Sequence, residues 1–169
     1  MTATVRRVVV LALPVVVLAA MVLRAEVIIA QGRHYVLDIE GYDPRDLLRG
    51  QYLRFRVRWS GGFGGACTPG EEGCCVCFGE NAEPDRPWVH HVACTEMSAC
   101  QAFINPESAR TVNQYFIPED MGGPLERAIR EKRATIRVAV SSRGEVIIED
   151  LLLDGQPWRD VVGRPPPSE

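Results

Sequence analysis

The sequence predicts an α+β protein that is mainly antiparallel β with one short amphipathic helix, on a single N-terminal transmembrane helix. Three observations lead to this class. A sixteen-residue apolar segment, Val8 to Leu23, follows Arg6 and Arg7. Several later segments alternate apolar and polar residues with the period of two that half-buried strands show. No strand–helix–strand alternation occurs, and no glycine-rich phosphate loop opens a helix, which argues against a parallel α/β fold.

The apolar segment has the layout of an export signal or a membrane anchor. Its length lies between the roughly 17–25 residues of a spanning helix and the roughly 7–15 of a cleavable signal. Cleavage sites after Ala20 and Ala30 are poor, because Leu18 and Ile28 occupy the −3 positions. A second short apolar run also follows the first. We therefore favour a retained anchor over residues 1–30, with cleavage as the alternative.

The basic residues before the apolar segment predict the orientation. Arg6 and Arg7 favour a cytoplasmic N-terminus. We expect a single-pass protein of the inner membrane whose C-terminal domain is periplasmic or otherwise extracytoplasmic. That domain should cover residues 31–158, with a cysteine-rich insert at about 60–110. We expect the tail, residues 159–169, to be disordered because its end is rich in proline and polar residues.

Charge argues against nucleic acid as a partner. Residues 1–30 hold three of the 19 basic and one of the 22 acidic residues. The remaining 139 residues suit a single domain and carry 16 basic and 21 acidic side chains, a net charge of −5. This domain therefore has no basic surplus for a phosphate backbone. Lys132 is the only lysine, which removes most lysine-based chemistry.

Two alternating strands are predicted at the start of the domain. Residues 33–40 place Tyr35, Leu37 and Ile39 on one face. Residues 52–59 place Leu53, Phe55, Val57 and Trp59 on one face and Tyr52, Arg54, Arg56 and Arg58 on the other. Between them, residues 43–50 (DPRDLLRG) predict a helical turn: Asp43 suits an N-cap, Pro44 the first helical position and Gly50 the C′ position.

The rest of the domain is read from turn residues and periodicity. A glycine-rich loop at 60–73 precedes three short apolar runs. A helix at about 124–133 places Leu125, Ala128 and Ile129 on one stripe. Residues 134–140 and 145–153 form a closing hairpin that buries Ile136, Val138 and Val140, followed by a turn at Asp154 and Gly155. The three apolar runs are 74–78, 88–94 and 101–104, and a fourth segment of this kind is 111–117.

Three segments together resemble the GDYXXLXY family of bacterial membrane-anchored proteins: residues 43–57, residues 114–120 and residues 151–158. The resemblance implies an exported domain on a single anchor. It also implies a multi-spanning membrane protein as partner, since family members are similar to proteins encoded beside such proteins. It implies no biochemical activity. The residues that match the motif and its surroundings are Asp43, Pro44, Arg45, Gly50 and Tyr52. The chain departs from the motif at three positions, where Gln51 replaces the aspartate, Phe55 the leucine and Val57 the final tyrosine.

All six cysteines lie within 34 residues, and two of the three histidines lie there too. In an exported chain, an even count in a glycine-rich segment indicates a disulfide-stapled insert. Cys74 and Cys75 should have different partners, because neighbouring strand residues face opposite ways. Cys94 and Cys100 could close a local loop. The cysteines are Cys67, Cys74, Cys75, Cys77, Cys94 and Cys100.

The alternative for this cluster is a copper or zinc site, or a thiol-redox centre. Thiolates with imidazole suit both metals. The one CxxC spacing, Cys74 to Cys77, lies within a short apolar run rather than at the start of a helix, which argues against redox catalysis, and no second such pair is present to complete a zinc site. The ligands of such a site would be Cys75, Cys77, His90, His91, Cys94 and Cys100.

The arginines of the second strand form a basic stripe that a solvated face paired with Asp38 and Glu40 would explain. The functional alternative is contact with lipid headgroups or an anionic partner through Arg54, Arg56 and Arg58. No catalytic constellation is recognised and no cofactor is expected. We therefore predict a non-catalytic interaction or accessory subunit of a membrane assembly, in contact with the lipid bilayer. A metal-binding or thiol-redox protein is the alternative.

Overall fold

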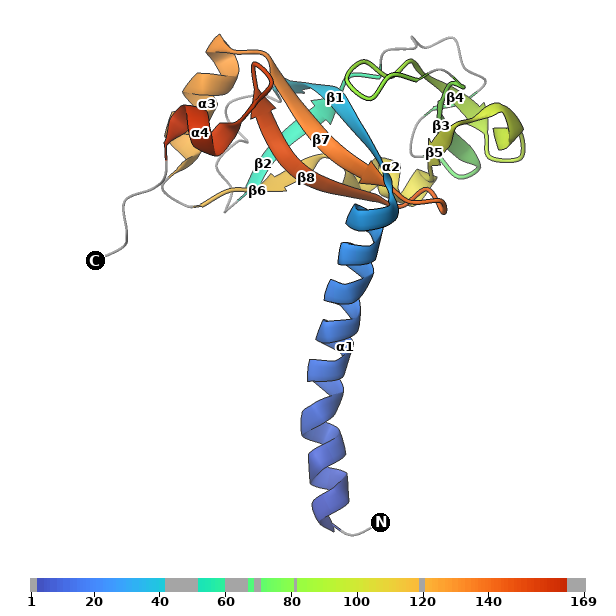
Figure 1. The fold of residues 1–169 in the computed structure, drawn as a ribbon, viewed down its shortest axis with the longest axis vertical. Coiled ribbons are helices and arrows are strands. Elements are labelled where there is room, and N and C mark those ends of the chain that lie inside the picture. The colour runs from blue at the N-terminus through green and yellow to red at the C-terminus, as the bar shows by residue number, and fades with distance from the viewer. Residues whose placement is uncertain are drawn as a thin grey trace.

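A long N-terminal helix, α1 (Ala3–Gln31), carries the globular part of the chain at its C-terminal end (Figure 1). The computed structural model describes residues 3–41, 52–59, 67–68, 71–80, 82–118 and 121–163. Within α1, residues Val10–Gln31 form a stretch of 22 residues that is long and apolar enough to cross a membrane. Its large apolar side chains are exposed to the surroundings rather than packed on the domain. These features confirm an apolar helix that fits a single membrane anchor.

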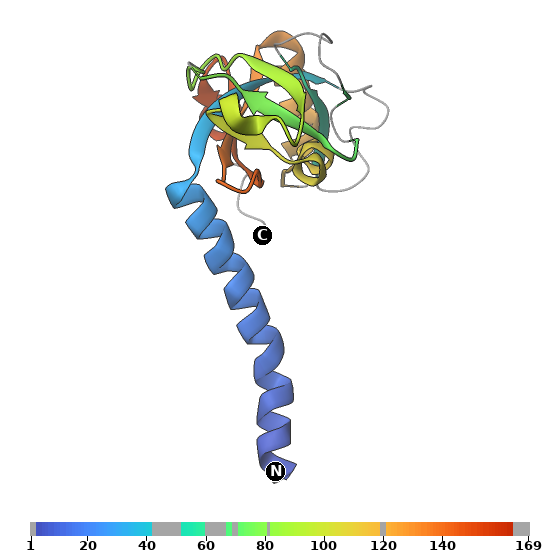
Figure 2. The same cartoon turned by 90° about the vertical axis from the view of Figure 1, so that its right-hand side faces the viewer.

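The main sheet has six strands, each paired antiparallel to its neighbours, in the order β6-β2-β1-β7-β8-β9. It curls into a half-barrel (Figures 1 and 2). The predicted faces of its first two strands are confirmed, because Tyr35, Leu37, Leu53 and Phe55 are buried. The strands are β1 (Arg33–Gly41), β2 (Tyr52–Val57), β6 (Gln114–Phe116), β7 (Ala134–Val140), β8 (Val146–Leu153) and β9 (Gln156–Pro157).

The closing hairpin is also confirmed. In β7, the side chains of Ile136, Val138 and Val140 are buried, as expected. The turn between β8 and β9 has positive φ at Asp154 (51°) and Gly155 (82°), the geometry of tight hairpin turns.

The cysteine-rich insert forms a second antiparallel sheet of three strands, in the order β4-β3-β5. Figure 2 shows it in front of the curled sheet. The ring of Phe78 stacks on Tyr35 of the main sheet, with centroids 4.0 Å apart, so the two sheets share one core. The elements are β3 (Cys74–Phe78), β4 (Val89–Ala93), the 3-10 turn η1 (Met97–Ala99), β5 (Ala102–Ile104) and helix α2 (Pro106–Thr111).

Two helices lie together at the end of the half-barrel away from the insert (Figure 1). Helix α3 (Gly122–Glu131) buries Leu125 and pairs Glu126 with Arg130, as its i,i+4 spacing predicts. Helix α4 (Trp158–Val162) corrects our expectation of a disordered tail from residue 159. The reason is burial: Trp158 is 1% exposed, and its indole N–H donates to the hydroxyl of Tyr115 at 3.3 Å.

Helix α2 was not anticipated from the sequence, whereas the helical turn predicted at 43–50 lies outside the described residues. So do Asp43, Pro44, Arg45 and Gly50 of the family motif, most of the glycine-rich loop and the last six residues.

Candidate interaction surface

The outward side of β2 meets the edge strand β6. The register places Tyr52 opposite Phe116 and Arg54 opposite Gln114, so these side chains share one face. The rings of Tyr52 and Phe116 are in edge-to-face contact at 6.1 Å, and the guanidinium of Arg54 lies 5.6 Å from the centre of the Tyr52 ring. The result is a small aromatic and cationic cluster at the edge of the main sheet.

Phe116 is the most unusual residue of this cluster, because its side chain is 73% exposed. The strand that carries it pairs only with β2, so its other edge is open in the described part of the chain. In Figure 1, β6 lies on the lower side of the domain, where α1 leaves it. Exposed aromatic residues beside arginine on an unpaired strand edge have the composition of protein-binding hot spots.

An open groove of about 730 Å³ continues this surface along β2. Phe55 donates its backbone N–H to Asn113 at 3.1 Å, and Arg58 donates to Asp38 of β1 at 2.8 Å. Because strand residues alternate in direction, the N–H and C=O of Val57 face the groove. The surface, here called the β2–β6 surface, comprises Tyr52, Arg54, Arg56, Val57, Trp59, Asn113, Gln114 and Phe116.

The predicted arginine stripe divides between two roles. Arg58 forms an ion pair with Glu40, with Nε 2.6 Å from the carboxylate, as the solvated interpretation expects. Asp38 pairs instead with Arg133 on the chain segment before β7. Arg54 and Arg56 line the groove of the β2–β6 surface. Of the three arginines, only these two line the groove, so they are the candidates for contact with an anionic partner.

The six cysteines form three disulfides: Cys67–Cys74, Cys75–Cys94 and Cys77–Cys100. The prediction that Cys74 and Cys75 have different partners is confirmed. The predicted local pairing of Cys94 with Cys100 is wrong, because strand β3 separates the two residues. Cys94 donates its N–H to Gly73 at the start of β3, whereas Gln101, next to Cys100, donates to Phe78 at its end.

The two histidines of the insert point to opposite faces of β4. His90 lies opposite Cys77 and its ring is 4.6 Å from that of Trp88, while His91 lies opposite Val76. His91 is 5% exposed. Burial lowers the pKa of His91 below its usual value because it disfavours the charged imidazolium, and the neighbouring His90 adds to the effect.

This geometry does not assemble the predicted metal ligands. A thiolate site and a disulfide use the same sulfur atoms, and all six sulfurs are paired. The described residues contain no group of three His, Cys, Asp or Glu side chains that could hold a metal ion.

The family model described as GDYXXLXY protein matches residues 14–151, from within α1 to within β8. The chain belongs to the GDYXXLXY family. No curated protein and no solved structure matches it. The GDYXXLXY motif falls on β2 and the residues before it. Tyr52 opens the strand on the outward side, whereas Phe55, at the motif's leucine position, is buried in the core.

Sequence reasoning missed Phe116 as a candidate surface residue of this GDYXXLXY protein. In the structure Tyr115 and Ile117 are buried, whereas Gln114 and Phe116 are exposed. The sequence has three consecutive apolar residues, Tyr115 to Ile117, so a period of two does not by itself indicate which of them faces outward.

Proposed function

We propose that this chain is a non-catalytic interaction or accessory subunit of a membrane assembly, anchored by α1, with its domain on the periplasmic or extracytoplasmic side of the inner membrane. The β2–β6 surface would bind an extended segment of a multi-spanning membrane protein. The observation that supports this most directly is the exposure of Phe116 on an open strand edge.

The chemistry of the surface suggests how such a segment would bind. An added strand would hydrogen bond to the backbone of Val57, in line with β6, which is the usual mode of β-augmentation. Arg54 and Arg56 would favour acidic side chains in that segment, and Phe116 would supply apolar contact. Because β6 lies on the side where α1 leaves, a segment just outside the bilayer could reach it.

Site-specific photo-crosslinking in intact cells tests this proposal. A photoreactive phenylalanine analogue replaces Phe116 in one variant and Trp88 in the control, since Trp88 is an exposed aromatic residue (58%) outside the surface. We expect the analogue at 116, but not at 88, to crosslink to one polytopic membrane protein. Crosslinks only to lipid, or equal products from both positions, would contradict the proposal.

Replacing the same two residues by alanine measures how much each side chain contributes to the free energy of partner binding. A hot-spot aromatic typically contributes about 2 kcal/mol or more, so Phe116→Ala should weaken partner binding roughly 30-fold. Trp88→Ala should leave binding unchanged. Binding that survives Phe116→Ala would show that the aromatic cluster is not the contact.

Orientation has its own test. Arg6 and Arg7 before the apolar segment motivate a cytoplasmic N-terminus. A phosphatase fused after residue 169 should then be active, and a reporter that works only in the cytoplasm should be silent there. The reverse pattern would refute the orientation, and a mature chain that begins after Ala20 or Ala30 would refute retention of the anchor.

A further inference from the structure

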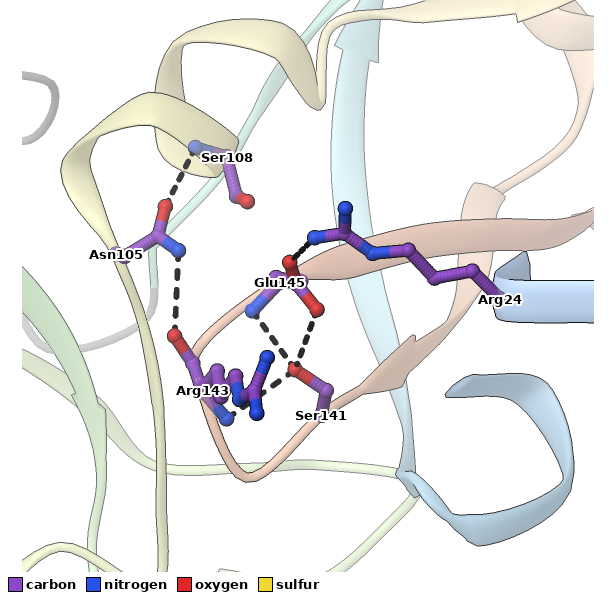
Figure 3. Close-up of polar contacts among 6 residues, drawn as sticks. All are labelled: Arg24, Asn105, Ser108, Ser141, Arg143 and Glu145. Atoms are coloured by element: carbon purple, nitrogen blue, oxygen red, sulfur yellow. Dashed lines mark hydrogen bonds and ion pairs between the residues drawn. The ribbon is translucent and has the colours of Figure 1, made fainter. Parts of the chain in front are cut away.

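A groove of about 760 Å³ lies between the last turns of α1 and the β7–β8 turn. Its α1 side carries the apolar residues Leu23, Val27 and Ile28, with Arg24 and Gln31 beside them. Its opposite side is polar and comes from the turn, residues 141–145 (Figure 3). An apolar wall that continues a membrane span, next to a polar wall, matches the two halves of a phospholipid.

The position of the groove along the helix axis also agrees with a phospholipid as its ligand. The apolar segment of α1 ends at Leu23, and Arg24 follows directly. A bilayer has a hydrocarbon core of about 30 Å and headgroup layers of roughly 5–7 Å on each side. Seven residues of helix separate Arg24 from Gln31, which corresponds to about 10 Å along the axis. If Val8 to Leu23 of α1 occupies the hydrocarbon core, Arg24 and the turn lie at the level of the headgroups on the side of the domain.

The charges in the groove favour an anion. Arg24 forms an ion pair with Glu145, and Glu145 also accepts a hydrogen bond from the hydroxyl of Ser141. The single carboxylate is thus used within the protein. Arg143 adds a second guanidinium that is exposed and makes no ion pair with a described residue. Two cations against one anion leave the groove with a net positive charge.

The turn holds these groups in place through its backbone. The hydroxyl of Ser141 accepts from the N–H of Arg143 at 3.2 Å and of Glu145 at 3.1 Å (Figure 3). Asn105 donates its side-chain N–H to the carbonyl of Arg143 at 3.3 Å, while its side-chain oxygen caps α2. Because Arg143 uses only backbone atoms in this network, its side chain is available for a ligand.

We propose that this groove binds an anionic phospholipid of the adjacent leaflet, with an acyl chain along Leu23 and Val27 and the phosphate between Arg24 and Arg143. The hydroxyl of Ser142, which lines the same groove, is a further donor to the phosphate. This inference rests on the membrane anchoring proposed above but not on the β2–β6 surface.

Spin-labelled lipids measure the selectivity directly. The full chain is placed in phosphatidylcholine nanodiscs that contain spin-labelled phosphatidylglycerol or spin-labelled phosphatidylcholine, and the motionally restricted fraction is recorded. We expect a preference for phosphatidylglycerol of several-fold. Arg143→Gln should reduce that preference about fivefold, the effect of about 1 kcal/mol for one basic residue at an anionic surface. Equal retention of the two lipids by the natural chain would overturn the proposal.

Two control variants separate this site from other effects. Arg127→Gln removes an exposed arginine from α3, away from the groove, and should leave the lipid preference unchanged. Phe116→Ala should also leave it unchanged, and Arg143→Gln should leave crosslinking at position 116 unchanged, so the two proposals can fail independently. An equal loss in Arg127→Gln and Arg143→Gln would reduce the effect to general charge and overturn the site.

Soluble glycerol phosphate distinguishes a lipid from a free phosphate. We expect it to leave the restricted fraction of phosphatidylglycerol unchanged, because it lacks the acyl chain that would contact the apolar wall. Competition at concentrations that do not alter the bilayer would show a site for the headgroup alone and would overturn the assignment to a lipid.

Discussion

Replacing Gly144 by alanine should damage the β7–β8 turn far more than the equivalent change at another left-handed glycine. Gly144 has φ +77°, and Gly155 in the β8–β9 turn has φ +82°. A Cβ at Gly144 would lie 2.5 Å from the ring of Phe103 and 2.8 Å from the backbone nitrogen of Asn105. A Cβ at Gly155 would meet nothing within 4 Å. The two sites share backbone strain and differ in contacts.

The expected magnitudes follow from this difference. A left-handed conformation costs a residue with a Cβ about 1–2 kcal/mol, and this should be the whole effect of Gly155→Ala. Gly144→Ala adds overpacking of about 1–3 kcal/mol, because the main-chain nitrogen of Asn105 cannot move away as a side chain can. The sum for Gly144→Ala is about 2–5 kcal/mol.

Urea unfolding of the full chain in detergent, with its disulfides intact, measures both effects. Tryptophan fluorescence reports unfolding, since Trp158 is buried in the core. Equal destabilisation by Gly144→Ala and Gly155→Ala would refute the contact between the turn and the insert. The double variant Phe103→Leu, Gly144→Ala should recover part of the loss, because it removes the closest ring atoms.

Three further outcomes are expected. Replacing both cysteines of Cys77–Cys100 by alanine should lower the free energy of unfolding by about 3 kcal/mol, against about 2 kcal/mol for Cys67–Cys74. The reason is that the first disulfide closes a loop of 23 residues and the second a loop of 7. Denaturation of the two double variants tests which loss is larger. Purified chain should contain no free thiol by alkylation and no stoichiometric copper or zinc by elemental analysis, and a metal lost on mutating His91 would move it to the metal-binding class. Stability should fall as pH drops below about 6.5, because the unfolded state binds the His91 proton more readily; His91→Gln should flatten this slope.

The sequence was sufficient for the sheet faces because their signal is local. Leu53 and Phe55 alternate with arginines along one strand, and a one-residue shift would expose the whole set. The hairpin from residue 134 is predicted for the same reason, together with its turn residues. In both cases, neighbours in the sequence carry the information that decides burial.

The features that escaped prediction depend on distant contacts or on weak local signals. Disulfide pairing depends on the way β3 lies between Cys94 and Cys100, which no spacing rule contains. Helix α2 has only six residues and buries none of them, so it lacks an apolar stripe; its signal was Asn105 as N-cap with Pro106 after it. Phe116 required knowing that β6 is an edge strand.

The junction between anchor and domain determines where the candidate surfaces can act. Only Gly32 separates α1 from β1, and its N–H donates to the carbonyl of Ile28 at 2.8 Å. A Cβ at this position would lie 2.4 Å from that carbonyl oxygen, so a side chain does not fit here. With one residue between the two elements, the chain passes from helix to sheet without a flexible linker. The ion pair between Arg24 and Glu145 adds a second connection from α1 to the β7–β8 turn.

If α1 spans a bilayer as proposed, such a junction holds the domain at one height above it. A domain on a long linker could present its surfaces anywhere within reach of the chain, whereas here the open edge of β6 stays near the level at which α1 leaves the domain (Figure 1). A partner segment for the β2–β6 surface would then lie close to the headgroup layer. Short extramembrane segments next to the spans of a polytopic protein satisfy this condition, and the tail of a freely diffusing soluble protein would have to enter the same layer to reach it. If the chain is anchored as proposed, this height supports the proposed membrane partner independently of the family resemblance.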